Sequence, residues 1–481
     1  MAKKTFYITT TAPYVNADPH IGFALEIVQA DVLARFNRLI GAKVAFGFGT
    51  DEHGLKIYRK ALEAKKDPLQ YCKEFSSRFD DLKKTLNLST THFIRTTDEA
   101  HMKAAQELWR RCFKNGDIYK KNYKTKYCVG CELEKTDSEL NAGKCPIHPN
   151  LVIEIIEEEN YFFKFSKYQK RLLQLYEDHP DFVVPDYRLD EIEAFVKSGL
   201  EDFSVSRLKN KMPWGVPVPD DPDHVMYVWF DALVFYISTL GWPDEKGDYS
   251  IFWPGMQVAG KDNLRQQSAI WQAMLMSAGL PNSTQIFIHG FITSNGQKMS
   301  KSLGNVVDPF KLVKKYGTDA VRYYLLKEIP PADDGDFSYR RMDEVYNSDL
   351  ANELGNLVSR LTTLAEKDEI KTIGNWQLTI DNRTKELFNS FQFNLILELI
   401  WKEIKALNKA IDDFAPWKKS PEERKDFLLQ CFKTLKSISY NLQPFLPETS
   451  EKILKVIKGK VKKIAPLFPR LTPSPSQIYT I

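Results

Sequence analysis

Two lysines three residues apart lie in a segment that has neither helical nor strand periodicity. The segment is NGQKMSKSLGN, residues 295–305, and it contains Lys298, Ser300 and Lys301. An Asn-Gly pair and a Gly-Asn pair bound it, which is typical of a loop. Lysines on a loop most often belong to a solvated surface. They could also bring positive charge to an anionic substrate, and the rest of the sequence must decide between these interpretations.

A second candidate site follows the first predicted strand. That strand is predicted at 4–10, and the spacing of apolar residues predicts a helix that starts near Gly22. The intervening stretch DPHIGFAL, residues 18–25, would place His20 and Gly22 at a helix N-terminus. Free N–H groups and the positive end of the helix dipole favour phosphate there. A capped turn with an incidental histidine is the ordinary alternative.

Four candidate metal ligands fall close together in the chain. Cys128 and Cys131 form one pair, Cys145 and His148 form another, and two residues separate the members of each pair. Such pairs suit a tetrahedral zinc ion, whereas unligated thiols are the alternative. Protein would fill all four positions, so the ion would be structural and not catalytic.

The elements that must position these residues alternate between strand and helix. Strands predicted at 4–10 and 43–51, with a helix between them, indicate a parallel βαβ unit. Short strands, the cysteine pairs and proline-bounded turns interrupt the alternation, which returns before a strand at 285–291. The predicted fold class is therefore α/β, with a Rossmann-like doubly wound parallel sheet split by a zinc-binding insertion. An all-α bundle follows, because the region from 338 to 460 has helical patterning almost throughout.

The expected domain boundaries follow from these breaks. The halves of the sheet domain are expected at 1–116 and 226–292, the insertion at 117–225, the loop and linker at 293–340, the bundle at 341–465 and an irregular tail at 466–481. Within the first half, a helix is predicted at 98–115, with Asp98 as its N-cap and Phe113 on its apolar face.

The composition is that of an ordinary globular protein. Of 481 residues, 43% are apolar and 27% charged, and the net charge of +4 allows a nucleic-acid partner without requiring one. No long uncharged apolar run and no signal peptide appear, so a cytoplasmic protein without membrane contact is expected. Six cysteines are too few for a disulfide framework. Those outside the two pairs are expected to be small buried residues: Cys72, Cys112 and Cys431.

HIGF at 20–23 and KMSKS at 298–302 together resemble the signatures HIGH and KMSKS of the class I aminoacyl-tRNA synthetases. Each motif alone is weak evidence, but the ordered pair on either side of an insertion is specific. Within the class, the resemblance is closest to the bacterial methionyl-tRNA synthetases. It extends from residue 5 to beyond residue 417 and includes APYVNADPHIG, GFGTDEHG, the cysteine pairs, YVWFDAL, GKDN, KMSKSLGNVVDP, YGTDAVRYYLL, LGNLVSRL and FAPW.

The resemblance implies an activity and its partners. Methionine and ATP would give methionyl-adenylate and pyrophosphate, and the methionyl group would pass to the 3′-terminal adenosine of initiator and elongator methionine tRNA. Mg²⁺ would accompany ATP, and Zn²⁺ would occupy the cysteine site. Negative charge gathers on the phosphates in this reaction, so His20, Lys298 and Lys301 would be catalytic through stabilisation of the transition state. The chain stops soon after the bundle, so a monomer is expected.

The resemblance also assigns binding roles by position. ATP contacts are expected from Asn16, His20, Gly22, His289, Gly290, Lys298, Ser300 and Lys301. Asp51 would bind the methionine ammonium. The pocket for the methionine side chain would be lined by Ala12, Tyr14, Trp229, Ala232, Leu233 and Tyr236, with Asn263 and Gln267 in the same region. The anticodon would be read by Asn356, Arg360 and Trp417. Ordinary core packing or an ordinary helix surface is the alternative for the aromatic and bundle residues.

Three residues depart from the family pattern. Phe23 replaces the second histidine of HIGH, while Asn263 and Gln267 stand where an aliphatic residue and a histidine are common. Contacts between these two amides, or water, could satisfy them. The departures leave two alternatives open: a class I synthetase for another apolar amino acid, and a synthetase-like tRNA-binding protein without ligase activity.

Overall fold

The computed structural model describes residues 4–135, 137–299, 304–371 and 378–471. Ser300 and Lys301 therefore lie outside the described residues. The chain forms two compact units: residues 1–19, 42–84 and 89–289 make up the first, and residues 20–41, 85–88 and 290–481 the second.

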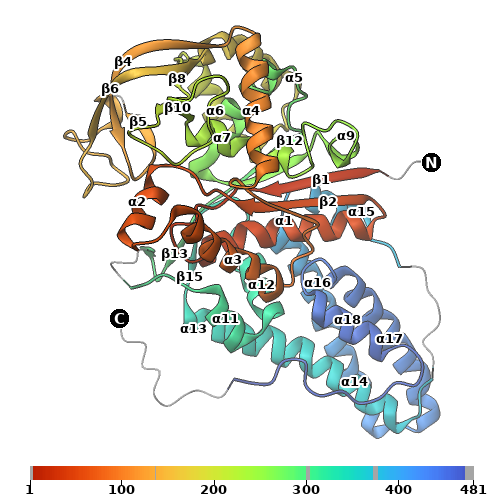
Figure 1. Ribbon diagram of the computed structural model, residues 1–481. Coiled ribbons are helices and arrows are strands. Elements are labelled where there is room, and N and C mark those ends of the chain that lie inside the picture. Colours follow the sequence, from red (N-terminus) through yellow and green to blue (C-terminus); the bar gives the residue numbers. More distant parts are fainter. Residues whose placement is uncertain (1–3, 136, 300–303, 372–377, 472–481) are drawn as a thin grey trace. The chain divides into compact units, whose positions relative to one another are not determined.

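A six-stranded parallel sheet forms the centre of the first unit (Figure 1). Its order is β3-β2-β1-β11-β12-β7, and all neighbouring strands run parallel. The strands are β1 (Thr5–Thr10), β2 (Lys43–Thr50), β3 (His92–Arg95), β7 (Val183–Val184), β11 (Met256–Gly260) and β12 (Gln285–His289). In β2 all residues except Lys43 are buried, as expected for a parallel strand that is covered on both faces. The predicted α/β fold with a split parallel sheet is confirmed.

A four-stranded antiparallel sheet interrupts the chain between β3 and β11. Its long pair, β4 (Ile118–Cys128) and β6 (Glu154–Phe163), is in register from Ile118 opposite Phe163 to Tyr127 opposite Glu154. The flanking strands are β5 (Leu133–Lys135) and β8 (Phe203–Ser204). The segment expected as an insertion also supplies β7, the edge strand of the central sheet.

Helix α4 (Glu99–Lys114) follows the predicted N-cap residue, Asp98, but the placement of one predicted apolar residue differs. Asp98 occupies the N-cap position, but its carboxylate accepts from the Arg95 backbone N–H at 2.8 Å and caps no helical N–H. The side chain of Phe113 is 53% exposed, so its placement on the buried face was wrong. Cys112 is buried, and the next residue points about 100° further around the helix, toward solvent.

The second unit consists mainly of helices. Its long members are α1 (Ile21–Leu39), α14 (Asn356–Lys367), α16 (Phe393–Phe414) and α17 (Pro421–Leu442), and a small sheet has the order β14-β13-β15. A capping box at Ser420 starts α17. The predicted helical bundle is confirmed.

Two further expectations concern membrane-spanning helices and the three cysteines outside the metal-ligand pairs. Among them, no helix combines the length and apolar character that a membrane crossing requires. Cys72, Cys112 and Cys431 are buried, as predicted.

Candidate active site and metal site

Several predicted site residues lie where strands of the central sheet end. Tyr14 follows β1, Asp51 follows β2, Asn263 follows β11, and His289 is the last residue of β12. Because the strands are parallel, their carboxyl ends meet at one edge of the sheet, where open α/β sheets bind ligands. Gly260 and His289 are direct partners across β11 and β12 at this edge.

Asp51 is buried and its backbone is tied to the loop after β1. Its N–H donates to the Pro13 carbonyl at 3.0 Å, and its carbonyl accepts from the Val15 N–H at 3.2 Å. Burial raises the pKa of Asp51 well above its ordinary value, and the nearby carboxylates of Asp231 and Glu132 raise it further. A carboxylate in such a setting gains much from a cationic partner, because an opposite charge favours its ionised form.

An aromatic pair stands next to this loop. The rings of Tyr14 and Trp229 meet edge to face, with centroids 6.4 Å apart and planes at 78°. Trp229 belongs to α7 (Val228–Leu233), and its buried indole N–H has no hydrogen-bond partner among the described residues. Both side chains are half-buried, so they can form a wall that a ligand still reaches. Aromatic faces of this kind suit a polarisable thioether.

The other predicted pocket residues are packed into the core nearby. Leu233 and Tyr236 belong to one buried hydrophobic cluster, and Ala12 packs against that cluster. Ala232 is also buried. Burial of this kind fits core packing as well as a pocket lining, so the binding role of these residues stays a prediction.

Asn263 and Gln267, the two polar residues that depart from the family pattern, form hydrogen bonds with different partners. Gln267 donates through Nε2 to the Tyr236 hydroxyl, while Asn263 donates through Nδ2 to Asp262 Oδ1 at 3.2 Å. The buried Oε1 of Gln267 has no partner in the described part of the chain. Gln267 therefore helps to hold the Tyr236 ring. The hydrogen bonds of the described residues include none between Gln267 and Asn263.

The start of α1 carries the residues predicted to meet ATP. The His20 ring accepts from the Gly22 N–H through Nδ1 at 3.1 Å, so a neutral ring carries its proton on Nε2 and can donate to an anion. A Cβ on Gly22 would lie 3.0 Å from that ring, closer than an ordinary contact, so a larger residue would have to displace the imidazole. The Ile21 N–H donates to the Val307 carbonyl at 3.0 Å. The helix start and the segment after KMSKS therefore lie side by side within the second unit.

The base of the lysine loop is held by specific hydrogen bonds. Lys298 ends β14 (Gln297–Lys298), its side chain is exposed, and its carbonyl accepts from Asn305 Nδ2 at 3.2 Å. The Gly296 N–H donates to Asp336 Oδ1 at 2.7 Å. The predicted ATP contacts of Ser300 and Lys301 fall outside the described residues.

Three further residues predicted to contact ATP have structural partners of their own. The Asn16 amide lies 3.1 Å from the Lys56 ammonium. His289 is buried, and Gly290 lies so close to the backbone of Asp333 that a Cβ there would overlap it. Packing therefore accounts for Gly290 whether or not nucleotide binds.

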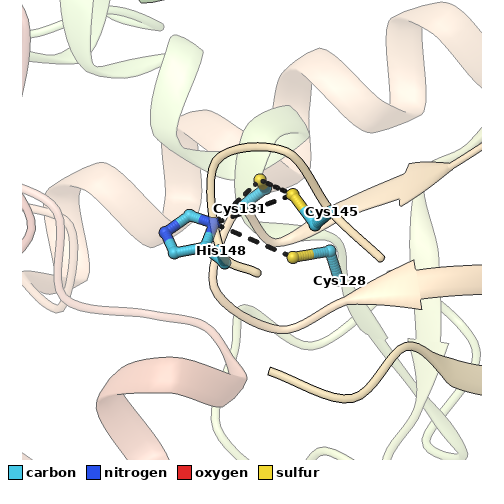
Figure 2. Close-up of side chains that lie close together, drawn as sticks. All are labelled: Cys128, Cys131, Cys145 and His148. Carbon is cyan, nitrogen blue, oxygen red and sulfur yellow. Dashed lines mark hydrogen bonds between the residues drawn. The ribbon is translucent and has the colours of Figure 1, made fainter. Parts of the chain in front are cut away.

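The two cysteine pairs converge on one point (Figure 2). The ligand atoms of Cys128, Cys131, Cys145 and His148 all lie within 4.8 Å of one another. His148 Nδ1 is 3.2 Å from Cys131 Sγ and 3.8 Å from Cys128 Sγ, and the sulfurs of Cys131 and Cys145 are 3.4 Å apart. The separations of 3.2, 3.4 and 3.8 Å are close to the edges of a tetrahedron with metal–ligand bonds of about 2.0–2.3 Å, so the residues fit a zinc ion. Because all four ligands come from protein, the ion would hold the segment together without entering the reaction.

Two of the predicted anticodon residues meet in the second unit. The guanidinium carbon of Arg360 lies 5.7 Å from the centroid of the Trp417 ring, and Arg360 Nη2 is 2.6 Å from Asp412 Oδ1. The Trp417 side chain is 56% exposed, which rules out a core indole at this position. Asn356 is exposed one helical turn before Arg360 on α14, so both lie on one face.

The chain is similar to known proteins over most of its length. A family model described as tRNA synthetases class I (M) matches residues 6–151 and 150–362. The chain is 42% identical to the methionine–tRNA ligase of Thermotoga maritima, over 95% of this chain and 76% of that protein, and 42% identical to that of Nostoc, over 94% and 89%. The chain belongs to the methionyl-tRNA synthetase family.

Solved structures of methionyl-tRNA synthetases agree with this assignment. The Mycobacterium tuberculosis methionyl-tRNA synthetase in complex with methionyl-adenylate superposes with a TM-score of 0.90 at 36% identity, over 97% of this chain and 100% of that chain. The apo form of the same enzyme gives 0.83 at 33% identity, over 98% and 99%. The predicted resemblance to methionyl-tRNA synthetases is confirmed.

Sequence reasoning missed one buried hydrogen-bond network of this chain. Asp231 accepts from His53 at 2.6 Å and from His101 at 2.8 Å, and the other nitrogen of His101 lies 2.8 Å from the Ser238 hydroxyl. Burial by itself raises the pKa of Asp231, but the two imidazoles outweigh it and lower the pKa to about 2. The stretches DEHG and YVWFDAL contain His53 and Asp231, yet nothing in either stretch indicates that the two side chains meet.

Proposed function

We propose that this chain is a methionine–tRNA ligase that activates methionine with ATP and transfers it to methionine tRNA. The observation that carries the proposal is the buried Asp51, whose backbone forms a β-bridge with Tyr14 and whose neighbour Tyr14 packs its ring against Trp229. One anion suits the ammonium of an amino acid, and aromatic rings suit a thioether side chain. The methionine–tRNA ligase relatives support the choice of substrate.

In the first step, a methionine carboxylate oxygen attacks the α-phosphorus of ATP and pyrophosphate leaves. Asp51 would hold the ammonium and so orient the attacking carboxylate. The His20 Nε2–H, together with the ammonium groups of Lys298 and Lys301, would meet the charge that grows on the phosphates. We assign the other ATP contacts to Asn16, Gly22, His289, Gly290 and Ser300, with Mg²⁺ bound to the nucleotide.

In the second step, a hydroxyl of the terminal adenosine of tRNA attacks the activated carbonyl, and AMP leaves. Asn356 and Arg360 would hydrogen-bond unpaired anticodon bases, and the exposed Trp417 would stack on one of them. We also propose Zn²⁺ at Cys128, Cys131, Cys145 and His148. We also retain the division of the chain into the six segments given above. We propose that the protein is a monomer, which sedimentation would test. We propose a cytoplasmic location, which cell fractionation would test.

Amino-acid-dependent ATP–pyrophosphate exchange tests the proposal. Exchange should respond to methionine in preference to leucine and valine, and aminoacylation should require methionine tRNA. A response to leucine or valine alone would indicate a synthetase for another apolar amino acid. No response to any amino acid would indicate a tRNA-binding protein without ligase activity, in which Phe23 has removed an essential donor.

A further inference from the structure

We propose that Glu132 is a positioning residue that fixes the methionine pocket through Tyr14 and the start of α2. Glu132 lies in residues 128–148, the metal-site segment that carries the four proposed metal ligands. The proposal rests on the function proposed above. It assigns Glu132 no contact with substrate and no part in the reaction. Its effect would be on the affinity for methionine, because the elements that it holds are those next to Asp51.

The position of Glu132 is unusual for an acidic residue. Its side chain is 1% exposed, although glutamate is rarely buried without partners. Its φ is 52°, in the left-handed region that favours glycine. Glu132 directly follows Cys131 in the chain. A metal bound to the Cys131 thiolate would therefore hold the backbone next to Glu132 in place. Backbone strain of this kind persists only where surrounding contacts determine the conformation.

The carboxylate of Glu132 joins two elements at the edge of the sheet. Oε1 accepts from the Lys56 backbone N–H at 2.5 Å, and Oε2 accepts from the Tyr14 hydroxyl at 3.3 Å. Lys56 lies in the first turn of α2 (Leu55–Glu63), whose N-cap residue is Gly54 and has no side chain to cap it. Glu132 thus supplies from outside the hydrogen-bond acceptor that the first turn of a helix needs.

Gly54 shows how closely the carboxylate is packed. A Cβ on Gly54 would overlap the Glu132 carboxylate, so only glycine leaves room for it. Gly54 also has a φ of 105°. Because residues 51–54 form one short connection between β2 and α2, a carboxylate that fixes Gly54 and Lys56 also restricts Asp51.

The backbone around Glu132 is bonded to the same neighbourhood. The Tyr227 hydroxyl donates to the Glu132 carbonyl, and Lys56 Nζ donates to the Gly130 carbonyl at 3.4 Å. Tyr227 is the residue immediately before α7, the helix that carries Trp229. The metal-site segment is therefore bonded to both sides of the Tyr14–Trp229 pair.

The first experiment measures equilibrium binding of labelled methionine without ATP. Glu132→Ala should weaken binding about tenfold or more, since it leaves buried donors without an acceptor. Glu132→Gln keeps a carbonyl acceptor and should be intermediate. The KM for ATP in exchange should be unchanged, and zinc content should remain near that of the wild type. Glu157→Ala is the matched control, because Glu157 is an exposed glutamate of strand β6, and the variant should bind methionine normally.

A double-mutant cycle with Tyr14→Phe tests whether Glu132 acts through the Tyr14 hydroxyl. Tyr14→Phe should weaken methionine binding in the wild type and have clearly less effect in the Glu132→Ala background, where the hydroxyl has already lost its acceptor. Normal binding by both Glu132 variants, or full additivity with Tyr14→Phe, would overturn the proposal. So would equal losses for methionine and ATP together with lost zinc, because that pattern means general disruption. If the wild type failed to bind methionine at all, the proposed function itself would be wrong.

A second measurement tests the link to the metal. Chelation of the wild type, with secondary structure checked by circular dichroism, should weaken methionine binding by a factor similar to that of Glu132→Ala. Chelation of the Glu132→Ala protein should add little. Equal losses in both proteins would show that the metal acts independently of Glu132, and would overturn the coupling.

Discussion

The His53 imidazole lies 2.6 Å from the buried Asp231 carboxylate, and this contact joins the loop after β2 to helix α7. His53 is two residues from Asp51, and Asp231 is two residues from Trp229. Residues proposed to bind opposite ends of methionine are therefore linked through a single buried pair. His101 completes the arrangement on the other oxygen of Asp231 at 2.8 Å.

Replacing Asp231 should destabilise the protein and alter its acid sensitivity. Asp231→Asn removes the charge that two buried imidazoles face, and such losses cost about 3 kcal/mol or more. The pKa of Asp231 is about 2 in the folded protein against 3.8 as its ordinary value. A depressed pKa stabilises the folded state at pH values above the ordinary pKa of the group. That contribution to stability is lost as the pH falls from about 4 to 2. Denaturant unfolding at pH 7 and at pH 3 should show a smaller difference between the variant and the wild type at pH 3.

Methionine binding should weaken as pH falls, because Asp51 has a raised pKa. Burial, Asp231 and Glu132 all favour its protonated form, which attracts an ammonium group poorly. Asp51→Asn should bind methionine about 10- to 100-fold more weakly at neutral pH, which is the cost of a hydrogen bond to a charged group. Titration of methionine binding between pH 5 and 8 should give a sloping profile for the wild type and a flatter one for Asp51→Asn. A sloping profile in the variant would assign the effect to another group.

Lys301→Ala should lower the rate of exchange by about 100-fold or more while methionine affinity changes little. Preplaced positive charge acts mainly on the transition state, where phosphate charge develops. Steady-state exchange together with equilibrium methionine binding separates the two quantities. Lys311→Ala is a suitable control, because Lys311 is an exposed lysine of α11 (Pro309–Tyr316), and it should keep the wild-type rate. Equal losses in the exchange rate and in methionine affinity would contradict a role of Lys301 in stabilising the transition state.

The metal site should contain about one zinc ion per chain, as expected for a closed set of four protein ligands. Cys145→Ser should lose the ion, because it removes one of the thiolates. Cys431→Ser, which alters a buried cysteine of the bundle, should retain it. Elemental analysis of the purified proteins makes the comparison, and zinc retained in full by Cys145→Ser would contradict the assignment.

Trp417→Ala should impair charging of tRNA without affecting methionine activation. Stacking of an aromatic ring on a base is worth about 1–3 kcal/mol, so the KM for tRNA should rise about 10- to 100-fold. ATP–pyrophosphate exchange without tRNA should be unchanged. Replacement of Tyr339, an exposed aromatic residue of the same unit, serves as a comparison and should leave the KM for tRNA unaltered.

Local pattern accounts for much of what could be predicted. The strand at Lys43–Thr50 and the helix at Ile21–Leu39 were recognisable because apolar periodicity and turn residues act over short distances. The spacing of Cys128, Cys131, Cys145 and His148 predicted a cluster that the structure forms. The prediction for Phe113 failed because a helix face is decided by the elements that pack on it.

The alternation of strands and helices, the two signatures and the paired metal ligands could be read from short stretches of chain. The contacts of Glu132 with Tyr14, of His53 and His101 with Asp231, and of Gln267 with Tyr236 became visible only in the folded chain. These partners lie up to 178 residues apart in the chain. Buried polar groups must find partners wherever packing places them, and packing depends on the whole fold.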